Sequence, residues 1–299
     1  MKWEDSIKGY ENYLKLEKSL SQNSIAAYIN DINKLVDFLH KDNKKTAPEK
    51  VKLDHLKSFL EWLNERGVSP RTQARTISGI KSFYKYLLIE GKIKSDPTAL
   101  LESPKIGRKL PDILSMEEID TLIDAVELDK PEGQRNKAML ETLYSCGLRV
   151  SELVNLKLTN LYFDQGFIKV EGKADKERLV PVSNRAVDET NKYLNGYRKT
   201  LKIHKDSENV LFLNRRGKKL SRVMVFTIIK NLAEKVDLDK KISPHTFRHS
   251  FATHLINGGA DLRAVQEMLG HESILTTEIY THLDRDYLKN TIHQFHPRS

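Results

Sequence analysis

The sequence predicts a mainly α-helical protein of two domains, the second of which contains a small antiparallel β-sheet. Three observations support this: the chain length, the spacing of apolar residues in the first third, and two strand-like runs near the middle. At 299 residues the chain has room for two domains of about 100–200 residues each. A hydrophobic fraction of 39% is enough to form cores. We place the boundary near residue 107, because residues 103–111 (SPKIGRKLP) are rich in proline and charge.

Residues 1–106 are expected to form four helices. Apolar residues recur there at the three- and four-residue steps that place side chains on one side of a helix. The four sets are Ile7, Tyr10 and Leu14; Ile25, Tyr28, Ile32, Leu35 and Leu39; Leu56, Leu60 and Leu63; and Ile77, Ile80, Tyr84 and Leu87. Gly67 can end the third helix and Gly91 the fourth, which Ser69 and Pro70 open as N-cap and first-turn residues.

Residues 107–299 are expected to be mostly helical, with one β interruption. Ser115 and Glu118 have the spacing of a capping box, so a helix begins there. Phe167–Val170 and Arg178–Val182 are strand-like runs joined by a polar turn. Three glycines divide the last third into short helices: Gly258, Gly259 and Gly270.

The chain is basic and has one cysteine. Lys and Arg number 50 against 41 Asp and Glu, a net charge of +9, which favours an acidic partner such as nucleic acid without establishing one. The single cysteine, Cys146, excludes an intramolecular disulfide and any multi-cysteine metal site.

No apolar run approaches the roughly 18 residues of a membrane span, and the first residues do not lead into a signal-peptide core. We therefore expect a cytoplasmic protein without membrane insertion.

The fourth helix of the first domain has a polar face opposite its apolar stripe. The side chains on that face are Arg71, Arg75, Ser78, Lys81, Ser82 and Lys85. For an isolated helix, a solvated surface explains the pattern. The alternative is a helix laid against DNA, in which the four cations Arg71, Arg75, Lys81 and Lys85 contact phosphates. The DNA-binding interpretation gains weight only if the second domain catalyses a reaction on DNA.

Several common catalytic motifs are absent. The sequence has no GxxxxGK[ST] phosphate loop, no HExxH zinc helix and no GxSxG nucleophile elbow. What remains is a set of cations and one tyrosine within residues 149–280. No metal or other cofactor is therefore expected.

Three of these side chains lie near expected helix starts. Arg149 begins one helix, and His245 and Arg248 share a face at the N-terminal end of another. Helix N-termini favour anions through their free N–H groups and the helix dipole. His249 lies four residues after His245, but no third ligand has a fitting spacing, so we interpret His249 as a core histidine rather than a metal ligand.

One reaction uses the whole set, which is Arg149, Lys173, His245, Arg248, His271 and Tyr280. A tyrosine hydroxyl, with a pKa near 10, is a poor nucleophile at neutral pH. Its attack on a phosphodiester becomes feasible when arginines neutralise the non-bridging oxygens, an imidazole takes the phenolic proton and an acid protonates the leaving sugar oxygen. The phosphotyrosine product conserves the energy of the phosphodiester, so strands can be rejoined without ATP.

Flanking residues support the same interpretation. The segments that carry it are SPRTQARTISGIKSFYKYL (69–87), RNKAMLETLYSCGLRVSELVNL (135–156), KADKERLVPV (173–182), SPHTFRHSFATHLINGGADLRAVQEMLGH (243–271), TTEIYTHL (276–283) and HPR (296–298). Over essentially its whole length the chain resembles the tyrosine recombinases, or phage integrase family, most closely the XerD-like Xer recombinases of bacterial chromosomes. Lys173 lies in a turn that reads GKADK where the family pattern is GKGNK.

The resemblance implies a role for each residue. Tyr280 is the nucleophile and leaves a 3′-phosphotyrosyl link and a free 5′-hydroxyl. Arg149 and Arg248 hold the scissile phosphate, and Lys173 is the acid for the leaving 5′-oxygen. His245 is the general base or proton relay.

The resemblance also implies a supporting phosphate donor, His271, and an architecture. The first domain corresponds to the SAM-like core-binding domain of the family, and the two domains are expected to form a C-shaped clamp around duplex DNA. Four protomers assemble on two sites, with copies of this chain or of a second Xer-type recombinase, and exchange strands through a Holliday junction. The last helix docks into a neighbouring protomer. A septal DNA translocase of the FtsK type is an implied activator.

Two alternatives stay open at this point. The resemblance implies that the chain resolves chromosome dimers for segregation at cell division, but the same chemistry could instead serve as the integrase of a phage, plasmid or transposon. In a different class, the chain could be a DNA-binding protein that kept the fold and lost catalysis. The two classes differ in one outcome, since only strand exchange requires Tyr280.

Overall fold

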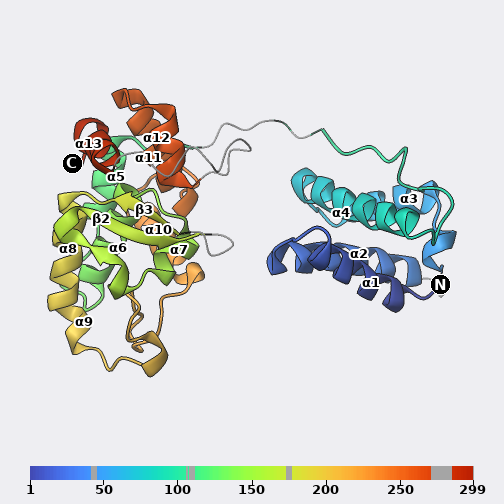
Figure 1. Ribbon diagram of the computed structural model, residues 1–299, viewed down its shortest axis with the longest axis horizontal. Helices are drawn as coiled ribbons and strands as arrows, with labels where there is room; N and C mark the ends of the chain where they lie inside the picture. Colours follow the sequence, from blue (N-terminus) through green and yellow to red (C-terminus); the bar gives the residue numbers. More distant parts are fainter. Residues whose placement is uncertain (42–45, 106, 108–111, 173–176, 271–284, 299) are drawn as a thin grey trace. The chain divides into compact units, whose positions relative to one another are not determined.

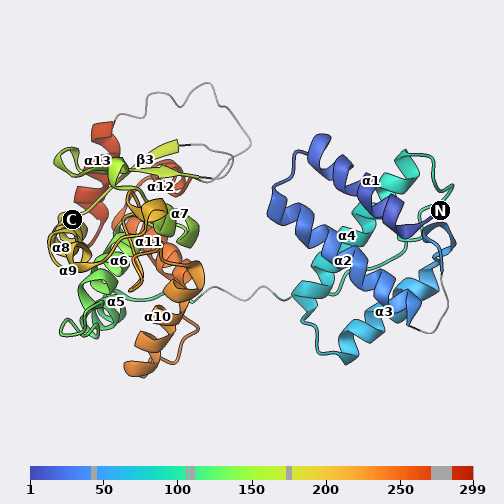
Figure 2. The same cartoon turned by 90° about the horizontal axis from the view of Figure 1, so that it is seen from below.

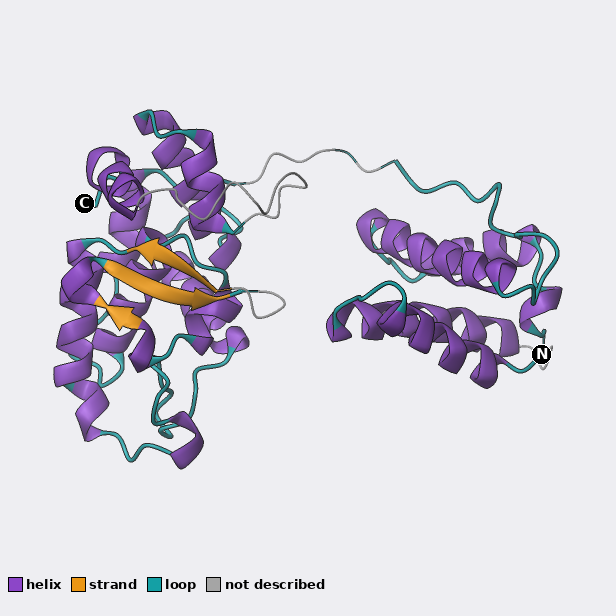
Figure 3. Cartoon of the chain, viewed as in Figure 1, coloured by secondary structure: helices purple, strands orange, loops and turns teal. Residues whose placement is uncertain are grey.

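The computed structural model describes residues 1–41, 46–105, 107, 112–172, 177–270 and 285–298. It divides into two compact units, Met1–Lys109 and Leu110–Ser299. Figures 1 and 3 show that the first unit is helical, whereas a small sheet lies among the helices of the second. The predicted class, mainly α with a small antiparallel sheet, is confirmed.

The first unit contains the four expected helices (Figure 2). They are α1 (Trp3–Leu16), α2 (Gln22–His40), α3 (Leu53–Glu65) and α4 (Pro70–Ile89), with a 3₁₀ turn at Pro48–Lys50. Ser69 caps α4 by accepting a hydrogen bond from the backbone N–H of Thr72 at 3.4 Å, as predicted. The core is strongly aromatic: Phe83 of α4 stacks on Trp3 and meets Tyr10 edge to face.

The second unit begins with the helix predicted at Ser115. Its helices are α5 (Met116–Asp124), α6 (Gly133–Ser145), α7 (Val150–Asn155), α8 (Asn184–Asn195), α9 (Tyr197–Thr200), α10 (Arg222–Lys235), α11 (Pro244–Gly258), α12 (Leu262–Leu269) and α13 (Arg285–Phe295). The capping box is present, since Glu118 Oε2 accepts from the N–H of Ser115 at 2.7 Å. Residues 138–146, which span the second half of α6 and its C-cap, are all buried, and α6 packs against α8 and α11. A helix buried on all sides forms the centre of a unit.

The sheet has one strand more than the sequence predicted. Strands β1 (Leu161–Tyr162), β2 (Phe167–Glu171) and β3 (Glu177–Pro181) run antiparallel in that order, with Phe167 opposite Pro181 and Glu171 opposite Glu177. The predicted hairpin is therefore confirmed with slightly different ends. A two-residue strand such as β1 is too short to show an alternating pattern, so its sequence carries no signal.

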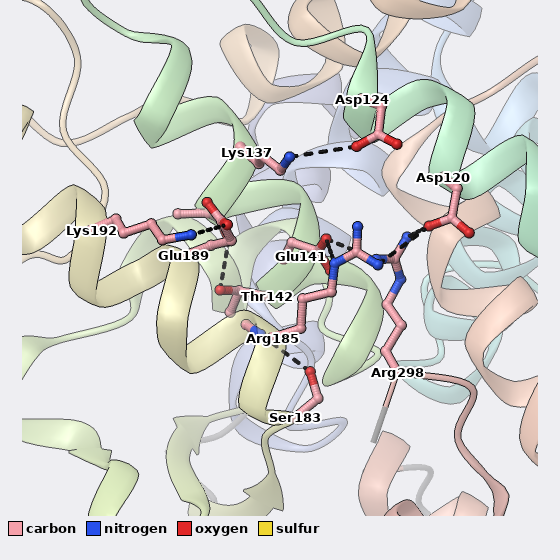
Figure 4. A network of polar contacts seen from close by, with 12 residues as sticks. Asp120, Asp124, Lys137, Glu141, Thr142, Ser183, Arg185, Glu189, Lys192 and Arg298 are labelled. Carbon is pink, nitrogen blue, oxygen red and sulfur yellow. Dashed lines mark hydrogen bonds and ion pairs between the residues drawn. The ribbon is translucent and has the colours of Figure 1, made fainter. Parts of the chain in front are cut away.

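The C-terminal residues are anchored within their own unit. α13 packs against α11, α12 and β3. Arg298, with 1% of its side chain exposed, donates from Nη1 to Glu141 at 2.8 Å and from Nη2 to Asp120 at 2.5 Å (Figure 4). Arg185 Nε lies 2.9 Å from the same Glu141 carboxylate. Two arginines thus compensate a buried carboxylate, the condition under which a buried charge is tolerated.

Within the described part of the chain, no helix combines the length and the apolarity needed to span a bilayer.

Candidate active site

Arg149 is the N-cap residue of α7, at the helix start that the sequence predicted. Its backbone N–H donates to Glu152 Oε2 and its Nη1 donates to Oε1, both at 2.8 Å. Its Nη2 donates to the carbonyl of Gly270 at 2.9 Å. The side chain is 35% exposed. Because a guanidinium carries five N–H donors, Arg149 keeps donors for an anion that arrives from solvent.

Arg248 approaches the same carboxylate from α11. Its Nη1 donates to the carbonyl of Gly147 at 2.8 Å and lies 3.9 Å from Glu152 Oε2. Its Nη2 donates to the carbonyl of Leu269 at 2.5 Å. Only 8% of the side chain is exposed. The structure thus brings Arg149 and Arg248, 99 positions apart in the sequence, to one point.

Two further residues of this cluster were missed by sequence reasoning. Glu152 is buried, and Arg178 on β3 clasps it with Nη1 on Oε1 and Nη2 on Oε2, both at 2.9 Å. The signal for Glu152 was its position three residues after Arg149, the spacing of a capping box. The signal for Arg178 was its position two residues before Val180, which is buried. Because residues two apart on a strand face the same side, this spacing places a cation on the inner side of the strand.

The three arginines also bind consecutive carbonyls at the C-terminal end of α12. The donor–acceptor pairs are Arg178 Nε to Met268 at 2.9 Å, Arg248 Nη2 to Leu269 and Arg149 Nη2 to Gly270. Gly270 has φ +60°, and a Cβ there would lie 3.1 Å from Nη1 of Arg178. A glycine therefore serves both the left-handed backbone and the close approach of the guanidinium.

The cluster carries excess positive charge. Burial alone raises the pKa of Glu152, but hydrogen bonds from Arg178 and Arg149 outweigh burial, so its pKa lies below the usual range. Burial, together with the charge of Arg149, lowers the pKa of Arg248 to about 10. At neutral pH three guanidinium groups therefore face one carboxylate. Such a site favours an anion that can accept hydrogen bonds, and a phosphodiester is one.

His245 lies in the first turn of α11 and is exposed. The prediction that His249 is a core histidine is wrong, because His249 is exposed too. The buried side of α11 is formed by other positions, which include Phe247, Arg248 and Phe251. Residues four apart share a helix face, so the exposure of one histidine extends to the other.

Three predicted catalytic residues lie outside the described residues. They are Lys173, His271 and Tyr280. In the sequence, Lys173 falls between β2 and β3, His271 directly follows Gly270, and Tyr280 falls between α12 and α13.

The cationic face of α4 is only partly a free surface. Arg71 and Lys85 are exposed and Lys81 is half-buried. Arg75 instead donates from Nη2 to Asp31 Oδ1 at 2.9 Å and from Nη1 to Oδ2, although 41% of its side chain remains exposed. One of the four cations therefore also stabilises the packing of α4 on α2.

In the portion of the chain that is described, no three His, Cys, Asp or Glu residues are grouped so that they could hold a metal ion. Cys146 is buried, and burial raises the pKa of its thiol to about 12, so it is not a nucleophile at neutral pH.

Comparison with known proteins decides the family. Residues 112–286 match the model of the phage integrase family, and residues 7–91 match that of the phage integrase N-terminal SAM-like domain. The chain belongs to the phage integrase family of tyrosine recombinases. This recombinase is 44% identical over 299 residues to tyrosine recombinase XerD of Chlorobaculum tepidum, covering 99% of this chain and 97% of that relative. It is 41% identical to tyrosine recombinase XerD of Listeria innocua, covering 99% of each chain.

These identities place it among the XerD-like members, which makes it a tyrosine-type enzyme of site-specific DNA recombination. Among solved structures, that of the XerH site-specific recombinase bound to a palindromic difH substrate matches with a TM-score of 0.71 at 24% identity. The match covers 95% of this chain and 83% of that one. At this identity the likeness shows the shared fold.

Proposed function

We propose that this recombinase cleaves duplex DNA by attack of Tyr280 on a phosphodiester that Arg149 and Arg248 hold. The observation that carries the proposal is the meeting of these two arginines at Glu152, with Nη1 of Arg149 at 2.8 Å and Nη1 of Arg248 at 3.9 Å from its oxygens. A shared carboxylate fixes the two guanidinium groups relative to each other without neutralising both. Two fixed cations match the two non-bridging oxygens of a phosphodiester.

The cleavage step transfers the phosphoryl group without loss of its energy. The Tyr280 oxygen forms a bond to phosphorus, and the bond from phosphorus to the 5′-oxygen breaks. His245 accepts the phenolic proton, and Lys173 gives a proton to the leaving 5′-oxygen. Rejoining is the reverse reaction with a different 5′-hydroxyl, so it needs neither ATP nor a metal.

The histidines have unequal roles in this scheme. His245 lies in the first turn of α11, where the helix N-terminus favours the approach of a phosphate. Its exposure leaves it open to substrate. His271 directly follows Gly270, whose carbonyl Arg149 contacts, and we assign it the supporting hydrogen bond to the phosphate.

The first unit, taken as the core-binding domain of residues 1–106, contributes phosphate contacts through α4. Arg71, Lys81 and Lys85 extend along this helix, with Arg75 as a fourth cation that Asp31 orients. Residues 107–299 form the catalytic domain. Together the two domains grip a duplex recombination site as a clamp.

We further propose that strand exchange takes place in a tetramer on DNA, with copies of this chain or with a second Xer-type recombinase. The role of the recombinase is to resolve chromosome dimers in the cytoplasm, and a septal DNA translocase activates it. The identity to curated XerD proteins over 99% of the chain supports this role. We also propose that the last helix, α13, docks into a neighbouring protomer; in the single chain, Arg298, which follows this helix, contacts Glu141 and Asp120.

The test is capture of covalent protein–DNA adducts on lightly nicked genomic DNA of the source organism, in an extract of that organism. A nick beside the cut lets the short strand diffuse away and traps the tyrosyl ester. Adducts at one chromosomal locus support dimer resolution. Adducts at the ends of a phage, plasmid or transposon would show an integrase instead, and an absence of adducts would contradict cleavage.

A further inference from the structure

Arg178 is a largely buried cation that the cleavage scheme does not use. It lies on β3, and 14% of its side chain is exposed. Both its terminal nitrogens donate to Glu152 at 2.9 Å, and its Nε donates to the carbonyl of Met268 at 2.9 Å. A planar guanidinium that grips a carboxylate with two parallel bonds fixes its orientation as well as its charge.

Glu152 is shared between Arg178 and Arg149. An ionised carboxylate offers about four lone-pair positions. Arg178 fills two of them, and the backbone N–H and Nη1 of Arg149 fill the other two, both at 2.8 Å. Without Arg178 the carboxylate would be free to rotate toward Arg149 and to take up the donors that now face solvent.

Arg178 also supports the second contact of Arg149. Its guanidinium lies against Gly270, where a Cβ would come within 3.1 Å of Nη1. The carbonyl of Gly270 accepts from Arg149 Nη2 at 2.9 Å. Both groups that hold the Arg149 side chain, Glu152 and the end of α12, are therefore themselves held by Arg178.

We propose that Arg178 is a positioning residue, which holds Glu152 and the end of α12 so that Arg149 keeps donors directed at the scissile phosphate. Arg178 does not itself touch the phosphate. This inference rests on the proposed function, because it assigns Arg149 to the phosphate.

The first test uses Arg178→Gln on a nicked duplex of the chromosomal sequence recovered by adduct capture. We expect the rate of adduct formation at saturating DNA to fall by about 10–100-fold, by analogy with the loss of a group that orients a metal ligand. DNA affinity should change little, because the cations that contact the remaining phosphates are intact. Arg135→Gln is the matched control: Arg135 is a buried arginine of the same unit that donates to Leu213 at 3.1 Å, away from Glu152.

The second test separates positioning from a general structural defect. On a duplex whose scissile phosphate is a neutral methylphosphonate, the charge that Arg149 neutralises is absent. On this duplex the rate of adduct formation by Arg178→Gln should lie within about threefold of the wild-type rate, and the same should hold for Arg149→Ala. A double-mutant cycle of the two changes on normal DNA should be strongly non-additive.

The outcomes are distinct. If the wild-type chain forms no adduct on the recovered sequence, the proposed function fails and this inference fails with it. If the wild type cleaves but Arg178→Gln cleaves at the same rate, only the inference is overturned. The same holds if Arg178→Gln slows cleavage by the same factor on normal DNA and on the methylphosphonate duplex. Should Arg178→Gln not fold, Arg178→Lys, which keeps the charge but not the two-pronged contact, takes its place with the same expected results.

Discussion

Arg75 on α4 and Asp31 on α2 form an ion pair in which one partner is wholly buried and the other is not. The Asp31 side chain has 0% exposure, and that of Arg75 has 41%. Thr76 Oγ1 also donates to Asp31 Oδ1 at 3.1 Å. The exposed part of Arg75 is available for the DNA contact proposed above, while its pairing with Asp31 compensates the buried carboxylate.

Arg75→Ala should therefore lower both stability and DNA binding, whereas Arg71→Ala should lower binding alone. Loss of Arg75 leaves a buried carboxylate with fewer partners, for which we expect a cost of about 1–3 kcal/mol in the free energy of unfolding. Replacing the exposed Arg71 with alanine should lower the free energy of unfolding by no more than about 0.5 kcal/mol. Urea denaturation measures the first effect and DNA titration the second. Equal stability losses in the two variants would contradict the role of Arg75 in packing.

DNA affinity should depend steeply on salt. If the two domains together neutralise six to ten phosphates, affinity should fall by about 10³–10⁵ between 50 and 200 mM salt. Arg71→Ala should reduce the slope of log affinity against log salt by about 1. Fluorescence anisotropy with labelled duplex measures both quantities. A flat response to salt would exclude binding around the duplex.

His296 should make the protein less stable in mild acid. Its ring is buried against Tyr144 and Phe251, and burial, with the nearby Arg298, lowers its pKa to about 3. The unfolded chain binds a proton near pH 6.5, so between pH 6.5 and 3 it holds more protons than the folded chain. The free energy of unfolding should then decrease as pH falls below 6.5, by up to about 1.4 kcal/mol per pH unit.

Replacing His296 with leucine should reduce this pH dependence, and urea denaturation between pH 7.5 and 5 measures it. Burial also lowers the pKa of the neighbouring His254, so part of the slope should remain. His249→Leu, at an exposed histidine, should keep the full slope. An unchanged slope in His296→Leu would show that other groups cause the acid sensitivity.

Gly147 should not tolerate alanine. Its φ is +55°, and a Cβ there would overlap the ring of Phe251, while its carbonyl accepts a hydrogen bond from Arg248. We expect Gly147→Ala to cost about 2–4 kcal/mol in stability and to slow cleavage, because the acceptor that orients Arg248 must move. Gly166→Ala is the control: φ is +76°, but only the flexible end of Lys289 lies nearby. Similar losses at both positions would show that the Phe251 contact is unimportant.

Local signals in the sequence predicted much of the fold. Ser69 and Ser115 cap helices, and the hairpin forms from the two strand-like runs, because caps and alternating patterns depend on residues close in sequence. The position of Arg149 at a helix start was predicted for the same reason.

The long-range contacts could not be predicted in this way. No local pattern pairs Arg178 with Glu152, 26 positions earlier, or Arg298 with Glu141, 157 positions earlier. The exposure of His249 depends on which side of α11 the second unit covers. Such facts belong to packing between elements, and spacing along one element does not determine them.

The most direct test of the account is to identify the residue that becomes linked to DNA. After cleavage of the nicked duplex, the trapped protein is digested with protease and nuclease, and the modified peptide is sequenced by mass spectrometry. We predict a nucleotide joined through its 3′-phosphate to Tyr280, a free 5′-hydroxyl on the released strand, and no adduct from Tyr280→Phe, which should still bind the duplex. A nucleotide on another residue, or an adduct formed by Tyr280→Phe, would contradict the account.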